Sequence, residues 1–138
     1  MTKELWINLP SKDLERTRRF YRDIGFSSNP NFPGGDSAVS LLVGNPQIVV
    51  MLFPEETFGG FAGSPVSDAG AAAEVLLSIG AESREEVDAL AAKAAAAGGE
   101  LYAKPGESQG WMYACGFADP DGHRWNVLYM DTDKMPGR

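Results

Sequence analysis

The chain has 138 residues, of which 43% are apolar and 22% are charged, and this composition predicts one compact globular domain. Its net charge of −7 argues against a nucleic-acid partner, because such proteins need a basic face. A single cysteine excludes an internal disulfide and a thiolate metal cluster. No apolar run approaches the ~20 residues of a membrane span and no signal-like start is visible, so we expect a cytoplasmic protein without a membrane partner.

The first part of the chain predicts a strand, then a helix, then further strands. The apolar run Glu4–Leu9 indicates a strand that ends at Pro10. Ser11 or Asp13 caps a helix that continues to about Ile24 and stops at a glycine. The remaining predictions are an extended stretch at Phe26–Phe32, a turn at 33–36, and strands at Ser37–Val43 and Gln47–Phe53 around a hairpin at 44–46.

Pro54–Ala73 differs in kind from its neighbours. It is rich in Gly, Ala and Ser, and Phe58 and Phe61 are embedded in it. It is too long for a simple turn. We expect either a linker between two halves or a mobile flap whose phenylalanines close over a site.

The second part predicts the same order of elements. Glu74–Ala81 indicates a strand, and Ser83 with Glu86 forms a capping box that begins a helix. The helix stops at a Gly-Gly pair, after which Glu100–Lys104 indicates a short strand and Pro105-Gly106 a turn.

The stretch Gly110–Asp131 carries most of the residues on which chemistry could depend. It contains the only histidine, the only cysteine and two of the three tryptophans. Its centre, Asp119-Pro120-Asp121-Gly122, is typical of a β-turn, with Pro at the second position and Gly at the fourth. Two aromatic and β-branched runs flank this turn, so we predict a strand hairpin.

Each half therefore predicts strand–helix–strand–strand–strand. One short helix covers one face of a four-stranded sheet, so the other face must meet the second half or a ligand. We predict an α+β fold in which two βαβββ repeats form curved mixed sheets around a cleft. As one domain over 1–138, it would comprise repeat one (1–54), a connecting segment (55–73), repeat two (74–131) and a tail (132–138).

Three motifs make the sequence resemble a known family. Asn8–Leu14 (NLPSKDL), Phe20–Phe26 (FYRDIGF) and Asp119–His123 (DPDGH) resemble the vicinal oxygen chelate superfamily. That group includes glyoxalase I, bleomycin resistance proteins, fosfomycin resistance enzymes and extradiol dioxygenases. The resemblance implies the paired βαβββ fold over nearly the whole chain, but the fold hosts many reactions.

In the superfamily's enzymes, His and Glu side chains from the first and last strands of each half hold a divalent metal. The resemblance implies four such positions, which here carry Trp6, Met51, Leu76 and Asn126. Indole and hydrocarbon side chains offer no free lone pair, a thioether is soft, and an amide oxygen is neutral. We therefore predict no metal, no other cofactor, and binding in preference to catalysis.

His123 and Cys115 give no alternative catalytic centre. His123 follows the predicted turn and is expected to be structural. Cys115 lies in an apolar strand, and the chain has no second histidine to activate it. We therefore expect its small side chain to be buried and to fill space in the core.

The residues at the ligand positions instead predict an apolar, aromatic cleft for a small organic molecule. The side-chain amides of Asn8 and Asn126 would supply its hydrogen-bonding groups. The predicted lining is Trp6, Asn8, Met51, Leu76, Trp111, Tyr113 and Asn126. Similarity to bleomycin resistance proteins, whose dimers place binding clefts between subunits, implies a homodimer.

Two alternatives stay open. One is a glyoxalase- or dioxygenase-like enzyme with a non-standard metal site, for which the candidate oxygen ligands are Glu55, Glu56, Glu74 and Glu107. The other is a structural or interaction module in which the side chains simply fill the cleft.

Overall fold

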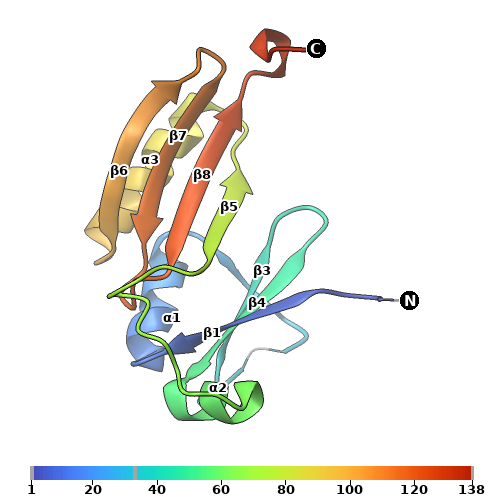
Figure 1. The fold of residues 1–138 in the computed structure, drawn as a ribbon, viewed down its shortest axis with the longest axis vertical. Coiled ribbons are helices and arrows are strands. Elements are labelled where there is room, and N and C mark those ends of the chain that lie inside the picture. Colours follow the sequence, from blue (N-terminus) through green and yellow to red (C-terminus); the bar gives the residue numbers. More distant parts are fainter. Residues whose placement is uncertain (1, 33, 138) are drawn as a thin grey trace. The chain divides into compact units, whose positions relative to one another are not determined.

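A computed structural model describes residues 2–32 and 34–137 (Figure 1). The chain divides into two compact units, with the boundary after Asp68. Each unit holds one four-stranded mixed sheet, which is curved and open, and the predicted βαβββ order occurs in both. The fold is therefore the predicted α+β architecture of two repeats.

The first unit is built on a sheet with the strand order β1-β4-β3-β2. β1 and β4 are parallel, and the other neighbours are antiparallel. Helix α1 packs on one face, where Phe20, Tyr21, Val50 and Leu52 are buried. The elements are β1 (Trp6–Ser11), α1 (Leu14–Asp23), β2 (Ser27–Ser28), β3 (Val39–Val43), β4 (Ile48–Pro54) and α2 (Glu55–Ala62).

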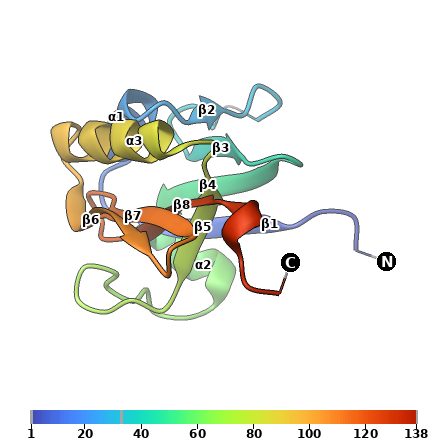
Figure 2. The ribbon, with the colours of Figure 1, turned by 90° about the horizontal axis from the view of Figure 1, so that it is seen from above.

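The second unit repeats this pattern with the strand order β5-β8-β7-β6. Helix α3 lies along one face of the sheet (Figure 2), above a core of Val87, Phe117, Trp125 and Val127. The elements are β5 (Leu76–Gly80), α3 (Arg84–Ala96), β6 (Glu100–Ser108), β7 (Met112–Ala118), β8 (Arg124–Met130) and a 3₁₀ turn η1 (Thr132–Lys134). Among the described residues, no helix combines the length and apolar character that crossing a membrane requires.

Both long helices begin at the predicted caps. Of the two candidates for the first helix, Asp13 is the cap, because its carboxylate accepts from the Arg16 N–H at 3.1 Å. Ser83 Oγ accepts from the Glu86 N–H at 3.1 Å, which confirms half of the capping box. The Glu86 carboxylate accepts from the N–H of Glu82, one residue before the cap, at 2.8 Å.

The predicted hairpin is also confirmed. The Gly122 N–H donates to the Asp119 carbonyl at 2.9 Å, and β7 pairs with β8 from Ala118↔Arg124 to Met112↔Met130. Gly122 has φ +96°, and a Cβ there would lie 2.7 Å from the backbone of Gly70. The turn therefore needs glycine both for its backbone angle and for the close approach of this neighbouring segment.

Two prolines lie inside strands that were predicted to end before them. Pro10 belongs to β1, an edge strand that pairs only with β4, so its missing N–H removes no second ladder bond. Pro105, predicted with Gly106 as a turn, lies inside β6 at a register shift between Ala103 and Gly106. At such an irregularity a residue without an N–H is tolerated, so the strand continues to Ser108.

The stretch predicted to be extended over Phe26–Phe32 is a strand only at Ser27–Ser28. The Asn29 side chain accepts from the Asn31 N–H at 3.0 Å, and this local bond turns the chain away from the sheet. The turn predicted at 33–36 includes residue 33, which lies outside the described residues.

The connecting segment is partly ordered as a helix. α2 covers its first eight residues and ends at Gly63, whose φ of +66° is typical of a helix C-cap. The ring of Phe61 packs edge-to-face on Phe53 of β4, with centroids 5.1 Å apart. The interpretation of the whole segment as a linker or as a flap stays a prediction.

Candidate functional site

Each sheet has one face packed on its long helix and one face free of it. In the first unit, Ser11 Oγ lies 2.7 Å from Thr17 Oγ1 of α1, so Ser11 faces the helix. Because side chains alternate along a strand, Trp6 and Asn8 lie on the opposite face, the α1-free face. Met51 pairs directly with Asn8 and shares that face.

These three residues differ in exposure. Trp6 is 48% exposed and Asn8 is also exposed, whereas Met51 is buried at 1%. The Trp6 indole N–H donates to the Glu4 carboxylate at 3.0 Å. The first unit thus presents an exposed tryptophan and an exposed amide on one sheet face.

In the second unit, the Cys115 thiol reaches the Val87 carbonyl of α3 at 3.9 Å, so Cys115 faces the helix. Gly116, Asn126 and Ser78 are aligned across β7, β8 and β5 on the other face, the α3-free face. Leu76 lies two residues before Ser78, on the same face, and is 53% exposed.

The two units place equivalent positions in the same register. Asn8 pairs with Met51, and Trp6 lies two residues before Asn8. Ser78 pairs with Asn126, and Leu76 lies two residues before Ser78. Within each unit, the first-strand and last-strand positions predicted for the site therefore share one face on neighbouring parallel strands.

Tyr113 does not lie with Asn126. It is two residues from Cys115 on β7 and shares the helix-facing side, where its hydroxyl donates to the Asp88 carboxylate of α3 at 2.6 Å. This bond raises the pKa of Tyr113, because deprotonation would break it and set two negative charges together.

Trp111 lies in the turn between β6 and β7. Its carbonyl accepts from the Asp131 N–H at 2.8 Å. Its indole Nε1 is buried and has no hydrogen-bond partner among the described residues. Its place in the predicted lining stays a prediction.

A polar cluster on the α3-free face was missed at the level of sequence. The Tyr102 hydroxyl donates to Asn126 Oδ1 at 2.8 Å and lies 3.2 Å from the Trp125 carbonyl. The Arg124 guanidinium lies over the Tyr102 ring, 4.3 Å from its centroid. A glycine inside a predicted apolar strand, Gly116, was the available signal, because such a glycine often marks a close approach.

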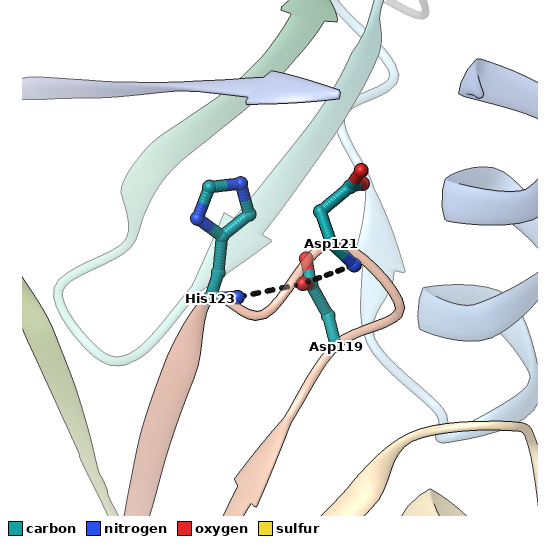
Figure 3. A group of neighbouring side chains, drawn as sticks. All are labelled: Asp119, Asp121 and His123. Carbon is teal, nitrogen blue, oxygen red and sulfur yellow. Dashed lines mark hydrogen bonds between the residues drawn. The ribbon is translucent and has the colours of Figure 1, made fainter. Parts of the chain in front are cut away.

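Asp119, Asp121 and His123 bring their possible ligand atoms within 4.8 Å of one another (Figure 3). Asp119 Oδ1 accepts from the backbone N–H groups of Asp121 (3.0 Å) and His123 (2.9 Å). None of the three residues is without a partner. The Asp119 carboxylate therefore holds the backbone of the hairpin turn, and the structural role expected of the His123 side chain stays a prediction.

A model of the Glyoxalase/Bleomycin resistance protein/Dioxygenase superfamily matches residues 5–127. The chain belongs to this superfamily. The match confirms the resemblance carried by the three motifs, and it spans both repeats. No curated protein matches the chain.

Several solved structures of the superfamily's fold are similar. A hypothetical protein, SA1046 from S. aureus, is 34% identical over 94% of both chains, with a TM-score of 0.80. A glyoxalase-related enzyme from Fulvimarina pelagi is 22% identical over 94% of this chain and 88% of its own, with a TM-score of 0.77. A superfamily enzyme from Burkholderia phytofirmans PsJN is 20% identical over 91% and 96%, with a TM-score of 0.73. At these last two identities the similarity shows the fold alone.

The residues at the superfamily's four metal positions do not fit a hard divalent ion. In the first unit the two positions hold an indole already bonded to Glu4 and a buried thioether. In the second unit they hold an exposed leucine and an amide whose oxygen accepts from Tyr102. Neither pair offers the imidazole nitrogen or carboxylate oxygen that such a site needs.

The glutamates considered for a non-standard site lie apart. Glu55 and Glu56 open α2, Glu74 precedes β5, and Glu107 pairs with Arg84 at 2.6 Å. In the described part of the chain, none of the four joins two other possible ligands in a metal-sized group.

Cys115 has the properties of a packed side chain. It is 3% exposed, and burial raises the pKa of its thiol to about 11. At neutral pH a thiol with that pKa is almost entirely protonated and is a poor nucleophile.

Proposed function

We propose that this superfamily member binds small organic molecules on the helix-free sheet face of a unit, the α1-free face in the first and the α3-free face in the second, and does so without the metal of the superfamily's enzymes. One observation carries the proposal. At the metal positions the chain has exposed tryptophan and leucine side chains, with amide groups beside them. Apolar and aromatic surface with a few polar groups is the usual composition of a site for an organic ligand.

A metal assay tests the first half of this proposal. We expect protein purified without chelator to contain far less than one equivalent of Mn, Fe, Ni or Zn by elemental analysis. A ligand that binds the folded state raises the melting temperature. Since we expect divalent ions not to bind, adding them should leave the melting temperature unchanged. One equivalent of metal with a raised melting temperature would contradict the proposal and favour the enzyme alternative.

A pair of exposed residues tests the second half. In a melt screen of neutral and charged organic compounds, we expect at least one compound to raise the melting temperature. Trp6→Ala should weaken its binding, since Trp6 lies on the α1-free face. The matched control is Leu5→Ala, which removes a 63% exposed side chain one residue before β1. Equal effects of the two variants, or no stabilising compound at all, would contradict binding at this face.

We further propose that the chain acts as a cytoplasmic homodimer, by analogy with the bleomycin resistance proteins of the superfamily. Light scattering after size-exclusion chromatography tests the oligomeric state directly. A mass of twice 14.8 kDa would support the dimer, and a single chain mass would contradict it.

A further inference from the structure

The cluster of Arg124, Tyr102 and Asn126 can recognise a particular chemical group. All three side chains lie on the α3-free face and are half-buried. They come from two strands, β6 and β8, that both flank β7. Between them runs β7, whose Gly116 lies beneath the tyrosine ring.

Gly116 fixes where the tyrosine lies. A Cβ on this residue would lie 2.5 and 2.6 Å from the Tyr102 ring atoms Cζ and Cε1 and 2.7 Å from the hydroxyl oxygen, closer than real contacts allow. β6 shifts its register between Glu100 and Ala103, which is where Tyr102 turns its ring across the sheet. The ring thus spans β7, its hydroxyl reaches Asn126, and its face receives Arg124.

Arg124 differs from the other arginines with described contacts. Arg18, Arg22 and Arg84 each pair with a carboxylate, from Glu15, Asp23 and Glu107 respectively. Among residues 2–32 and 34–137, no carboxylate pairs with Arg124. Arg124 is thus a half-buried guanidinium that no described carboxylate neutralises, in a chain with a net charge of −7.

The hydrogen-bonding groups left over are donors. Asn126 Oδ1 already accepts from Tyr102, so the amide of Asn126 offers its two N–H groups. The Arg124 guanidinium carries five N–H donors in a planar fork that matches a carboxylate. The register puts exposed Leu76 directly beside Arg124, which adds apolar surface at the edge of the cluster.

We propose that Arg124 and Asn126 form a subsite for the carboxylate of a small organic acid whose apolar part lies against Leu76. A single guanidinium balances one negative charge, which favours a carboxylate over a doubly charged phosphate. Tyr102 is a positioning residue, since it holds Arg124 by its ring and Asn126 by its hydroxyl. This inference rests on the proposed function and names the ligand class of the second repeat.

Benzoate and benzamide are suitable probes, because they have the same shape and differ in charge. Binding to the full chain would be followed by calorimetry and by the Nε–Hε resonance of Arg124 in an assigned NMR spectrum. We expect saturable benzoate binding that shifts this resonance, with benzamide about ten-fold weaker or more. Inorganic phosphate should bind more weakly than benzoate.

Variants separate the contributions of Arg124 and Asn126 to benzoate binding. Arg124→Gln should weaken benzoate binding by about ten-fold or more and leave benzamide unchanged. Asn126→Asp keeps an acceptor for Tyr102 but replaces the N–H donors with a negative charge, so it should also weaken the binding of benzoate. The matched control is Lys104→Gln, which removes a positive charge from an exposed residue on β6 and should change neither probe.

Three outcomes would overturn the subsite. They are equal binding of benzoate and benzamide, no benzoate binding with an unmoved Arg124 resonance, and an equal loss in Lys104→Gln and Arg124→Gln. The NMR measurement uses wild-type protein, so it decides the matter even where a variant fails to fold. Stabilisation by neutral compounds alone would overturn the carboxylate subsite and leave the proposed small-molecule function standing.

Discussion

The two repeats share one backbone plan and differ in what they place on their helix-free faces. At equivalent register positions, Met51 of the first unit corresponds to Asn126 of the second, and Ser40 corresponds to Gly116. The first unit places exposed Trp6 and Asn8 on this face, together with the Phe53–Phe61 ring contact. The second surrounds its equivalent positions with a hydrogen-bonded and stacked polar cluster.

This difference shows that the βαβββ plan fixes positions and leaves their chemistry free. Parallel pairing of the first and last strands brings the same two positions together in both units. A metal enzyme of the superfamily fills such positions with imidazole and carboxylate groups. This chain fills one pair with indole and thioether and the other with leucine and amide, so the same plan supports recognition of organic groups.

The largest expected effect concerns Gly116. Gly116→Ala should lower the free energy of unfolding by up to about 3 kcal/mol, because its Cβ must displace the half-buried Tyr102 ring, which also holds Asn126 and Arg124. The control is Gly80→Ala on β5, where a Cβ meets no described atom within 4 Å and the change should be neutral or slightly stabilising. Urea unfolding of both variants measures the contrast.

The corresponding position in the first unit sharpens that contrast. Ser40 Oγ is buried and has no hydrogen-bond partner among the described residues. Ser40→Ala should therefore be neutral or stabilising, since it removes a buried polar atom that makes no bond. Similar losses in Ser40→Ala and Gly116→Ala would show that the two faces are not organised differently.

The second prediction concerns pH and the helix-facing side of the second unit. Burial raises the pKa of the Cys115 thiol from 9.0 to about 11, so the unfolded chain releases this proton at lower pH than the folded chain does. The contribution of the protonated Cys115 thiol to the free energy of unfolding is fully present below pH 9. It falls by about 2 kcal/mol as the pH rises from 9 toward 11. Unfolding free energies at pH 8 and 10.5 should fall more for wild type than for Cys115→Ala. Equal falls would contradict the assignment to Cys115.

The sequence predicted the features that depend on local chemistry. Asp13, Ser83 and the turn at Asp119–Gly122 act through hydrogen bonds a few residues apart, so their residue types suffice to identify them. The order of strands and helices follows from hydrophobic periodicity, which is also local information.

The features that the sequence did not reveal depend on strand register and on which face of the sheet a side chain occupies. Tyr113 was placed in the cleft because it is aromatic, but it shares its side of β7 with Cys115, which faces the helix. Asn126 pairs with Gly116, which follows Cys115 in β7, so Asn126 lies on the opposite face of the sheet from Tyr113. The strand beyond Pro105 and the position of Tyr102 both depend on irregularities in β6, which arise from pairing with β7 and leave no clear pattern in the sequence.

The third prediction compares the two helix caps. Asp13→Ala and Ser83→Ala should each lower the free energy of unfolding by about 1 kcal/mol, since each leaves a backbone N–H of the first helical turn without its acceptor. In the described residues of the second helix, the Glu86 carboxylate also accepts from the Glu82 N–H just before the cap. Glu86→Ala should therefore lower the free energy of unfolding by a few tenths of a kcal/mol. The control is Glu85→Ala, which removes a neighbouring carboxylate outside the capping box and should change little in urea unfolding. Equal losses in Glu85→Ala and Glu86→Ala would contradict a specific role for the bond from the Glu82 N–H to the Glu86 carboxylate.

The smallest expected effect concerns α2, the helix that has no counterpart in the second repeat. Phe61 is 71% exposed yet packs edge-to-face on Phe53, so Phe61→Ala should lower the free energy of unfolding by only about 0.5–1 kcal/mol. Phe32→Ala is the control, because Phe32 is 48% exposed and makes no ring contact among the described residues.

Limited proteolysis makes this last comparison decisive. If the Phe53–Phe61 contact holds α2 against β4, Phe61→Ala should accelerate cleavage near Gly59–Gly63 several-fold, while Phe32→Ala should leave that rate unchanged. Cleavage there measures local opening, which a small change in global stability does not reveal. Equal rates in wild type and Phe61→Ala would mean that α2 opens independently of this contact, as expected of a segment that acts as a flap.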